Sequence, residues 1–190
     1  MTVAHNFPLL GEPLALDLVN TCVRRDHADV DLLGSPAALA AWLHLESARL
    51  AWSGPVSHAD LRAVQGLRTA LATLLDARRE GTRPPTAALR KLNAALAAPA
   101  ATARLMWTAA GPKLVQPTAA SRREVLLHAL AADAVSVLTG PSAAQLRVCA
   151  HPDCVLQFVA RNPRRRWCSA AVCGNRARVA RHYQRQRTDS

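Results

Sequence analysis

Residues 149–173 read CAHPDCVLQFVARNPRRRWCSAAVC and hold four of the five cysteines of the chain. Cys149 and Cys154 form one close pair, and Cys168 and Cys173 form a second pair with the same spacing. Two such pairs, about a dozen residues apart, suit a tetrahedral Zn²⁺ site in which each turn supplies two thiolates. Because four thiolates fill the coordination sphere, the spacing predicts a structural zinc with no open catalytic position.

Two alternatives compete with a site made of four cysteines. Disulfide bonds are the first, but the opening MTVAHNFPLLGEP lacks the basic and apolar segments of an export signal, so we expect a cytoplasmic protein with reduced thiols. The second is His151, which lies inside the first pair and could replace one cysteine as a ligand. Cys22 stands alone in an apolar stretch and is expected to be a buried thiol.

Most of the positive charge lies in the same part of the chain. The protein carries a net charge of +11, and residues 147–190 hold ten Arg and two Asp. This asymmetry predicts a polyanionic partner for the basic part. Arg suits planar bidentate contacts with phosphate and with guanine. The alternative is a solubilising tail in a protein that uses Arg far more often than Lys, which occurs only twice.

The pattern around the cysteines predicts a small module made of a hairpin and a helix. We expect a strand at Val155–Val159, a turn at Asn162-Pro163 and a return strand through Trp167, with Phe158 and Trp167 packed over the metal site. A final helix is expected over residues 175–186. So basic a segment buries too little apolar surface to fold alone, and metal ligation supplies the missing free energy.

Candidate nucleic-acid contacts gather in this module. On the final helix, three arginines share one side, while Val179, Ala180 and Tyr183 form a narrow apolar side that is expected to pack on the cysteine turns. The three adjacent arginines before Trp167 repel one another unless an anion is bound. The candidate contacts are Arg164, Arg165, Arg166, Asn175, Arg176, Arg178, Arg181 and Arg185.

Ahead of the module, the sequence predicts a helical domain over residues 1–140, followed by the zinc module over 141–190. Its apolar content is mostly Ala, Leu and Val, which favours a mainly α fold. Helices are expected over residues 13–25, 36–51, 59–79, 86–97 and 117–139, and a short β-hairpin over 102–116. Val125 is expected to face the core. Trp42, Trp52 and Trp107 are expected to anchor the core, with a ligand cavity as the alternative.

Motifs at both ends of the chain resemble a known bacterial family. Residues 166–169 (RWCS), followed by residues 173–176 (CGNR), resemble the CGNR zinc finger, and residues 14–21 (LALDLVNT) resemble the start of the ABATE domain that precedes it. The resemblance implies a stress-linked transcription regulator whose finger binds DNA and whose four cysteines hold zinc. It also implies that Gly174 permits a tight turn, that Asn175 caps the helix, and that Arg176 contacts phosphate or braces the fold.

The motif at the N-terminal end allows two interpretations. On a continuous helix, Asp17, Asn20, Thr21 and Arg24 share one face. They could form a polar pocket for a small-molecule effector, with Asp17 and Arg24 as a charged pair. The interpretation we favour is a hydrogen-bond network at a helix end that satisfies buried backbone groups.

These features together predict a DNA-binding regulator. The alternative is an RNA- or ribosome-associated zinc protein, because attraction to phosphate does not distinguish the two polymers. We do not expect an enzyme, since the sequence shows no nucleophile–base motif and no phosphate-binding glycine loop. No apolar run is long enough for a membrane span. A single finger has a small surface for DNA, so a homodimer or a partner protein is expected.

Overall fold

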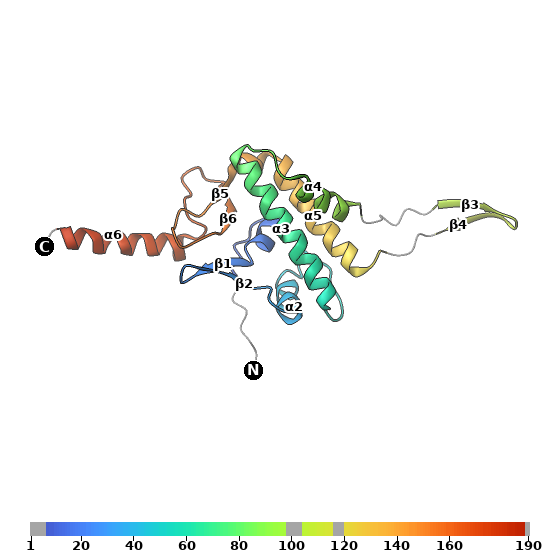
Figure 1. Ribbon diagram of the computed structural model, residues 1–190, viewed down its shortest axis with the longest axis horizontal. Helices are drawn as coiled ribbons and strands as arrows, with labels where there is room; N and C mark the ends of the chain where they lie inside the picture. The colour runs from blue at the N-terminus through green and yellow to red at the C-terminus, as the bar shows by residue number, and fades with distance from the viewer. Residues whose placement is uncertain (1–6, 98–103, 116–119, 189–190) are drawn as a thin grey trace.

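The protein is described by a computed structural model that covers residues 7–97, 104–115 and 120–188 (Figure 1). Before residue 140, this part of the chain forms the helices α1 (Leu14–Val19), α2 (Pro36–Leu45), α3 (His58–Glu80), α4 (Thr86–Leu96) and α5 (Arg122–Thr139). The final helix is α6 (Asn175–Thr188). Antiparallel hairpins join β1 (Cys22–Arg25) to β2 (Ala28–Asp31), β3 (Arg104–Thr108) to β4 (Gly111–Val115), and β5 (Leu146–Val148) to β6 (Gln157–Val159). The predicted mainly α class with short hairpins is confirmed.

The long helix α3 is the centre of the body, and its ends follow from local sequence. Ser57 and Asp60 form a reciprocal capping box, and Gly81 ends the helix at φ +68°, a conformation that glycine adopts without strain. Arg123, in the first turn of α5, donates to Asp60 at 2.6 Å. The start of α5 is therefore tied to the start of α3.

The core lies where α3 packs on α1, α4 and α5 (Figure 1). Leucines at helical spacing on α3 are fully buried, and Trp42 of α2 is buried as predicted. Val125 does not face the core as expected and is 47% exposed. The buried stripe of α5 runs through Leu126 and Leu130, and Val125 lies beside that stripe rather than on it.

The predicted helix over residues 13–25 is wrong beyond its first turns. α1 ends at Val19, and the chain continues into β1. The Thr21 hydroxyl donates to the Leu18 carbonyl at 2.6 Å, and the Asn20 side chain bonds to the backbone of Gln157. Such side-chain bonds to the backbone compete with helix continuation.

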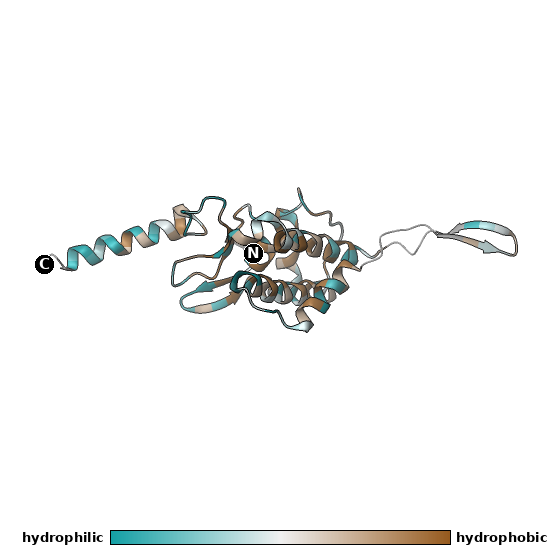
Figure 2. Ribbon diagram, turned by 90° about the horizontal axis from the view of Figure 1, so that it is seen from above, coloured by the Kyte–Doolittle hydropathy of each residue, from teal (hydrophilic) through white to brown (hydrophobic). Residues whose placement is uncertain are grey.

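The β3–β4 hairpin confirms the strands predicted near Leu105 and Leu114, and it projects from the helical body at the end opposite α6 (Figures 1 and 2). Residues 102–103 and 116–119 of the predicted hairpin and helix lie outside the described residues. Trp107, on β3, is 80% exposed, so the prediction that it anchors the core is wrong. Trp52 is half-buried, and the Arg122 guanidinium lies over its ring at 5.4 Å.

Candidate metal centre and nucleic-acid interface

The four cysteines of the C-terminal module meet in one cluster. Their sulfur atoms all lie within 4.8 Å of one another, and the Cys154–Cys168 and Cys168–Cys173 separations are 3.8 and 3.6 Å. A tetrahedral zinc with Zn–S bonds of about 2.3 Å has sulfur–sulfur edges of about 3.8 Å. These separations exclude S–S bonds of about 2.05 Å. The cluster therefore fits one tetrahedral metal ion.

Local backbone geometry presents the sulfurs to one point. Cys149 follows β5. Its backbone N–H donates to the Leu156 carbonyl at 2.9 Å, which closes the turn that holds Cys149 and Cys154. Cys173 lies in a single π-helical turn, Ala170–Gly174, that opens α6. A Cβ on Gly174 would lie 3.1 Å from the Trp167 ring, so this glycine lets the turn pass close to the indole.

The electrostatics of the cluster favour thiolate formation at Cys154. The hydrogen bond from Cys168 lowers the pKa of the Cys154 thiol to about 5. Burial raises the pKa of Cys173 to about 12, so this thiol needs the charge of a cation to ionise at neutral pH. The alternative ligand, His151, is not part of the cluster, and its Nδ1 lies 3.2 Å from the backbone N–H of Asp153. Cys22 is half-buried rather than buried and stands apart.

A small apolar core supports the metal site. Phe158 is fully buried, Trp167 packs against the same cluster of side chains, and both were predicted to cover the site. The hairpin was predicted wrongly, because β6 pairs with β5 and not with a return strand through Trp167. The reason is Arg165, whose guanidinium donates to the carbonyls of Val159 and Trp167 and so holds the connecting segment as a loop.

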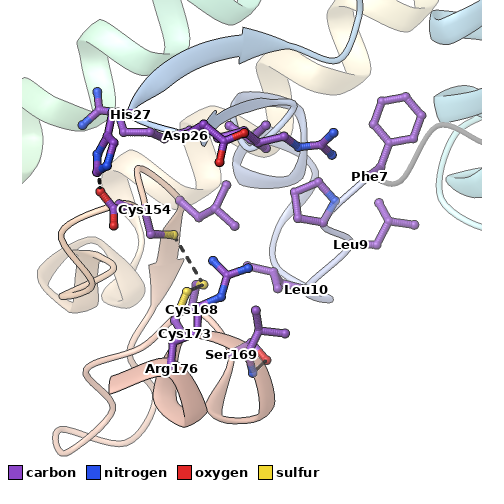
Figure 3. A pocket seen from close by; sticks show the side chains of 17 residues that line it. Phe7, Leu9, Leu10, Asp26, His27, Cys154, Cys168, Ser169, Cys173 and Arg176 are labelled. Atoms are coloured by element: carbon purple, nitrogen blue, oxygen red, sulfur yellow. Dashed lines mark hydrogen bonds and ion pairs between the residues drawn. The ribbon is translucent and has the colours of Figure 1, made fainter. Parts of the chain in front are cut away.

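A groove of about 890 Å³ lies beside the cysteines, between the β1–β2 hairpin and the cysteine turns (Figure 3). Cys154, Cys168 and Cys173 lie along it, with Arg176 beside them. At its edge, His27 lies 2.8 Å from Asp153 of the first turn. The helical body and the metal module therefore share the walls of one groove.

Most of the predicted nucleic-acid residues are exposed on one extended element. Arg176, Arg178, Arg181 and Arg185 all lie on α6, which stands clear of the body (Figure 2). Asn175 begins α6, and its Oδ1 accepts a 3.4 Å bond from Arg178. In the loop before the second cysteine pair, Arg164 and Arg166 are exposed, and the Arg166 guanidinium lies 5.4 Å from the Trp167 ring centre.

Arg165 differs from its two neighbours because it is engaged inside the fold. Its guanidinium lies 4.3 Å from the Phe158 ring centre, donates to the Cys168 carbonyl at 2.7 Å, and pairs with the buried Glu12 at 2.8 Å. A guanidinium in these contacts braces the metal module against the helical body. We therefore correct its assignment from a nucleic-acid contact to a structural residue.

The apolar side of α6 does not pack on the cysteine turns as predicted. Val179 is 45% exposed and Tyr183 is 62% exposed. The helix leaves the module end-on, so its turns beyond the first lie past the metal site (Figure 1). Both its basic side and its apolar side face solvent.

The predicted effector site is not assembled. Asp17 is buried and pairs with Arg49 of the segment after α2 at 2.5 Å, whereas Arg24 pairs with Asp29 across the β1–β2 hairpin at 2.8 Å. The predicted pair of Asp17 with Arg24 is wrong, because the helix ends before Arg24. Thr21 accepts a 2.8 Å bond from the buried Arg68. These contacts agree with the hydrogen-bond network that we favoured.

Asn20 joins the helical body to the metal module. Its side-chain amide donates to the Gln157 carbonyl at 2.9 Å and accepts from the Gln157 N–H at 2.8 Å. Glu12 makes a second link, accepting from the Val159 N–H at 3.0 Å and pairing with Arg165. Sequence reasoning missed Glu12 and Arg49, because no local spacing connects them to partners far along the chain.

The buried Asp17 carboxyl makes stability depend on pH. Burial raises its pKa from 3.8 to about 6, although Arg49 opposes the shift. The stability that this raised pKa contributes is therefore fully present below pH 3.8 and is lost as pH rises through about 6, on the order of 3 kcal/mol. In urea unfolding, Asp17→Asn should flatten the decline of stability between about pH 4 and 7. Asp29→Asn removes an exposed ion pair and should leave the decline of stability with pH unchanged. Equal slopes for wild type and Asp17→Asn would show that Asp17 does not cause the decline.

The four cysteines cluster at two turns, the second of which opens an Arg-rich helix, and this arrangement is that of a zinc-finger module bonded to a helical body. Comparison with known families agrees: residues 12–141 match ABATE, described as "Putative stress-induced transcription regulator", and residues 145–186 match the CGNR zinc finger. The chain belongs to the ABATE family and carries a CGNR finger at its C-terminal end, which confirms the resemblance seen in the sequence. A search of curated proteins finds no match. None of the described helices has the length and apolar character that crossing a bilayer requires.

Proposed function

We propose that this zinc-binding regulator acts by binding duplex DNA through α6. The observation that carries the proposal is the placement of α6, which is held at one end by the metal site and is exposed along its length. Arg178, Arg181 and Arg185 lie on one side of it. An α-helix of this width fits the major groove of B-DNA.

The charge of α6 supports a polyanionic partner. Its sequence, NRARVARHYQRQRT, holds five Arg and no acidic residue. Like charges at helical spacing destabilise a helix, and a lone helix of this length is marginal in water. Phosphates that neutralise the arginines would remove this repulsion, so DNA binding and ordering of α6 support each other.

In this proposal zinc is structural and the protein acts by binding rather than by catalysis. The residues that would hold zinc are Cys149, Cys154, Cys168 and Cys173. Four thiolates leave no ligand position for water or substrate. Zinc orients the turn that opens α6, and so fixes the direction in which the helix leaves the body.

A selection of bound fragments from randomised duplex DNA, with zinc-loaded protein, tests the proposal. One recovered motif, measured with its salt dependence, supports a sequence-specific regulator. Tighter binding of structured RNA than of duplex DNA at matched salt would replace the proposal with an RNA-associated function. Recovery without a motif would reduce the role of α6 to general attraction of polyanions.

Within α6, replacing Arg181 with alanine should weaken DNA binding while leaving zinc in place. The guanidinium is exposed, and its only described bond is to the Ala177 carbonyl of its own helix at 3.3 Å. Loss of one phosphate contact should reduce the slope of log affinity against log salt by about one. The control is Arg90→Ala on α4, an arginine that is also exposed and lies outside the finger. An Arg181→Ala slope equal to that of the control would place Arg181 away from the phosphates.

A further inference from the structure

We propose that the groove beside the metal centre admits a hydroperoxide, which oxidises Cys154 and joins it to Cys168 in a disulfide bond. The three groups that this reaction needs lie along the groove: a sulfur that solvent reaches, a second sulfur next to it, and a cation. The reaction belongs to the metal centre and does not depend on DNA binding by α6. Only its effect on DNA binding rests on the proposed function.

Cys154 is the cysteine of the cluster that solvent reaches. It is half-buried, whereas Cys149, Cys168 and Cys173 are buried. It also lines the groove of about 890 Å³. A cysteine that holds a metal is a thiolate, the form that attacks peroxides, and among thiolates the more exposed one reacts first. The groove therefore directs a small oxidant to Cys154 before the other three.

The Cys168 sulfur is placed to complete the disulfide. It lies 3.8 Å from the Cys154 sulfur, and both cysteines line the groove (Figure 3). An S–S bond is about 2.05 Å long, so a small approach of two sulfurs that are nearly in contact completes it. Cys173 lies 3.6 Å from Cys168, but a bond between these two requires attack of the oxidant on a buried sulfur. The position of Cys168 therefore suits it as the second sulfur.

Arg176 supplies a cation at the same place. It lines the groove from the first turn of α6, and its side chain lies beside Cys168 and Cys173 (Figure 3). Within the described residues, its guanidinium has no hydrogen bond or ion pair. A guanidinium donates charge-assisted hydrogen bonds to a developing anion. Arg176 is therefore placed to stabilise the hydroxide that leaves the peroxide.

The two steps balance in atoms and electrons. The Cys154 thiolate attacks one oxygen of hydrogen peroxide, the O–O bond breaks and hydroxide leaves, so that Cys154 becomes a sulfenic acid. The Cys168 thiolate then attacks the Cys154 sulfur, the S–O bond breaks and a second hydroxide leaves. The two thiolates have lost two electrons, and the peroxide has gained them. Only Cys149 and Cys173 remain as ligands, so the metal site is lost and the turn that opens α6 is no longer held.

The test treats the full, zinc-loaded protein, carrying Cys22→Ser, with hydrogen peroxide and follows zinc release with the dye 4-(2-pyridylazo)resorcinol. We expect one zinc to be released for every two thiols lost, and dithiothreitol with added zinc to restore the site. After free thiols are blocked, cleavage at arginines and before Asp153 separates Cys149 from Cys154, and tandem mass spectrometry locates the bond. The first disulfide should join Cys154 to Cys168.

Replacing Arg176 with alanine should slow zinc release by peroxide about tenfold, the effect of losing one charge-assisted hydrogen bond in the transition state. The matched control is Arg178→Ala, because Arg178 is exposed on the same helix and is not among the residues that line the groove. Arg176→Lys keeps a charged donor and should recover part of the rate. A merely structural role of Arg176 has the opposite sign, since looser metal binding would speed zinc loss both with and without peroxide.

The outcomes separate this reaction from the proposed function. Zinc retention by the protein at a peroxide concentration that oxidises free glutathione would overturn the proposal. A first disulfide between any other pair of cysteines would also overturn it, as would zinc release that is as fast in Arg176→Ala as in Arg178→Ala, or faster. Failure of the protein to bind duplex DNA would overturn the proposed function and leave the oxidation of Cys154 unaffected.

Discussion

Replacing Cys168 with serine should abolish metal binding and unfold the C-terminal module. Its sulfur lies 3.8 Å from that of Cys154 and 3.6 Å from that of Cys173, so its loss removes the ligand at the centre of these contacts. Structural zinc in finger domains contributes on the order of 10 kcal/mol, more than so small a module gains from apolar burial. Zinc content, limited proteolysis and hydrogen exchange over residues 146–188 measure the effect.

The chain offers its own control for this experiment. Cys22 is a half-buried cysteine outside the cluster, so Cys22→Ser should retain one zinc per chain and normal protection of the module. Full zinc content in Cys168→Ser would show that the ligand set is wrong. Removal of zinc from the wild type by a chelator should reproduce the Cys168→Ser phenotype, with the helical body still folded.

Replacing Arg165 with alanine should cost about 3–5 kcal/mol of folding free energy, although it is one of three adjacent arginines. The change leaves the Glu12 carboxylate, which is 1% exposed, without its cation. It also uncovers Phe158 and frees the Cys168 carbonyl next to the metal site. Denaturant unfolding of the zinc-loaded protein measures the loss.

Arg164 is the matched control, because it is adjacent in sequence and exposed. Arg164→Ala should leave stability within about 0.5 kcal/mol of the wild type. Adding Glu12→Gln to Arg165→Ala should recover part of the loss, since a neutral amide removes the unpaired buried charge. Equal stabilities of Arg164→Ala and Arg165→Ala would contradict the bracing role.

The features that the sequence predicted correctly depend on local pattern. Paired cysteines, a capping box at Ser57, a glycine at position 81 and leucines at helical spacing on α3 all act within a few residues, and the structure contains each of them. The mainly α class and the metal cluster could therefore be predicted without knowledge of long-range contacts.

The features that the sequence did not predict depend on contacts between distant segments. α1 ends early because Asn20 bonds to Gln157, and Arg165 turns into the fold because the buried Glu12 lies beside it. Arg164, Arg165 and Arg166 have the same side chain and adjacent positions, so no local pattern separates the structural one from the exposed ones. Trp107 was predicted wrongly because residue type alone was used. Tryptophan normally anchors a core, but this one lies exposed on a hairpin outside the core.

The two-point bond between Asn20 and the backbone of Gln157 limits how such regulators can be recombined. Zinc fingers are often treated as interchangeable parts that can be cut out and fused to a new protein. Here the backbone N–H and C=O groups of Gln157, in the finger's β6 strand, both bond to the Asn20 side chain of the helical body. A transplanted finger would leave both groups without those partners. A working chimera therefore has to keep the helical body together with the finger, because Glu12 and Asn20 flank α1, and α1 is itself buried against α3 and α5.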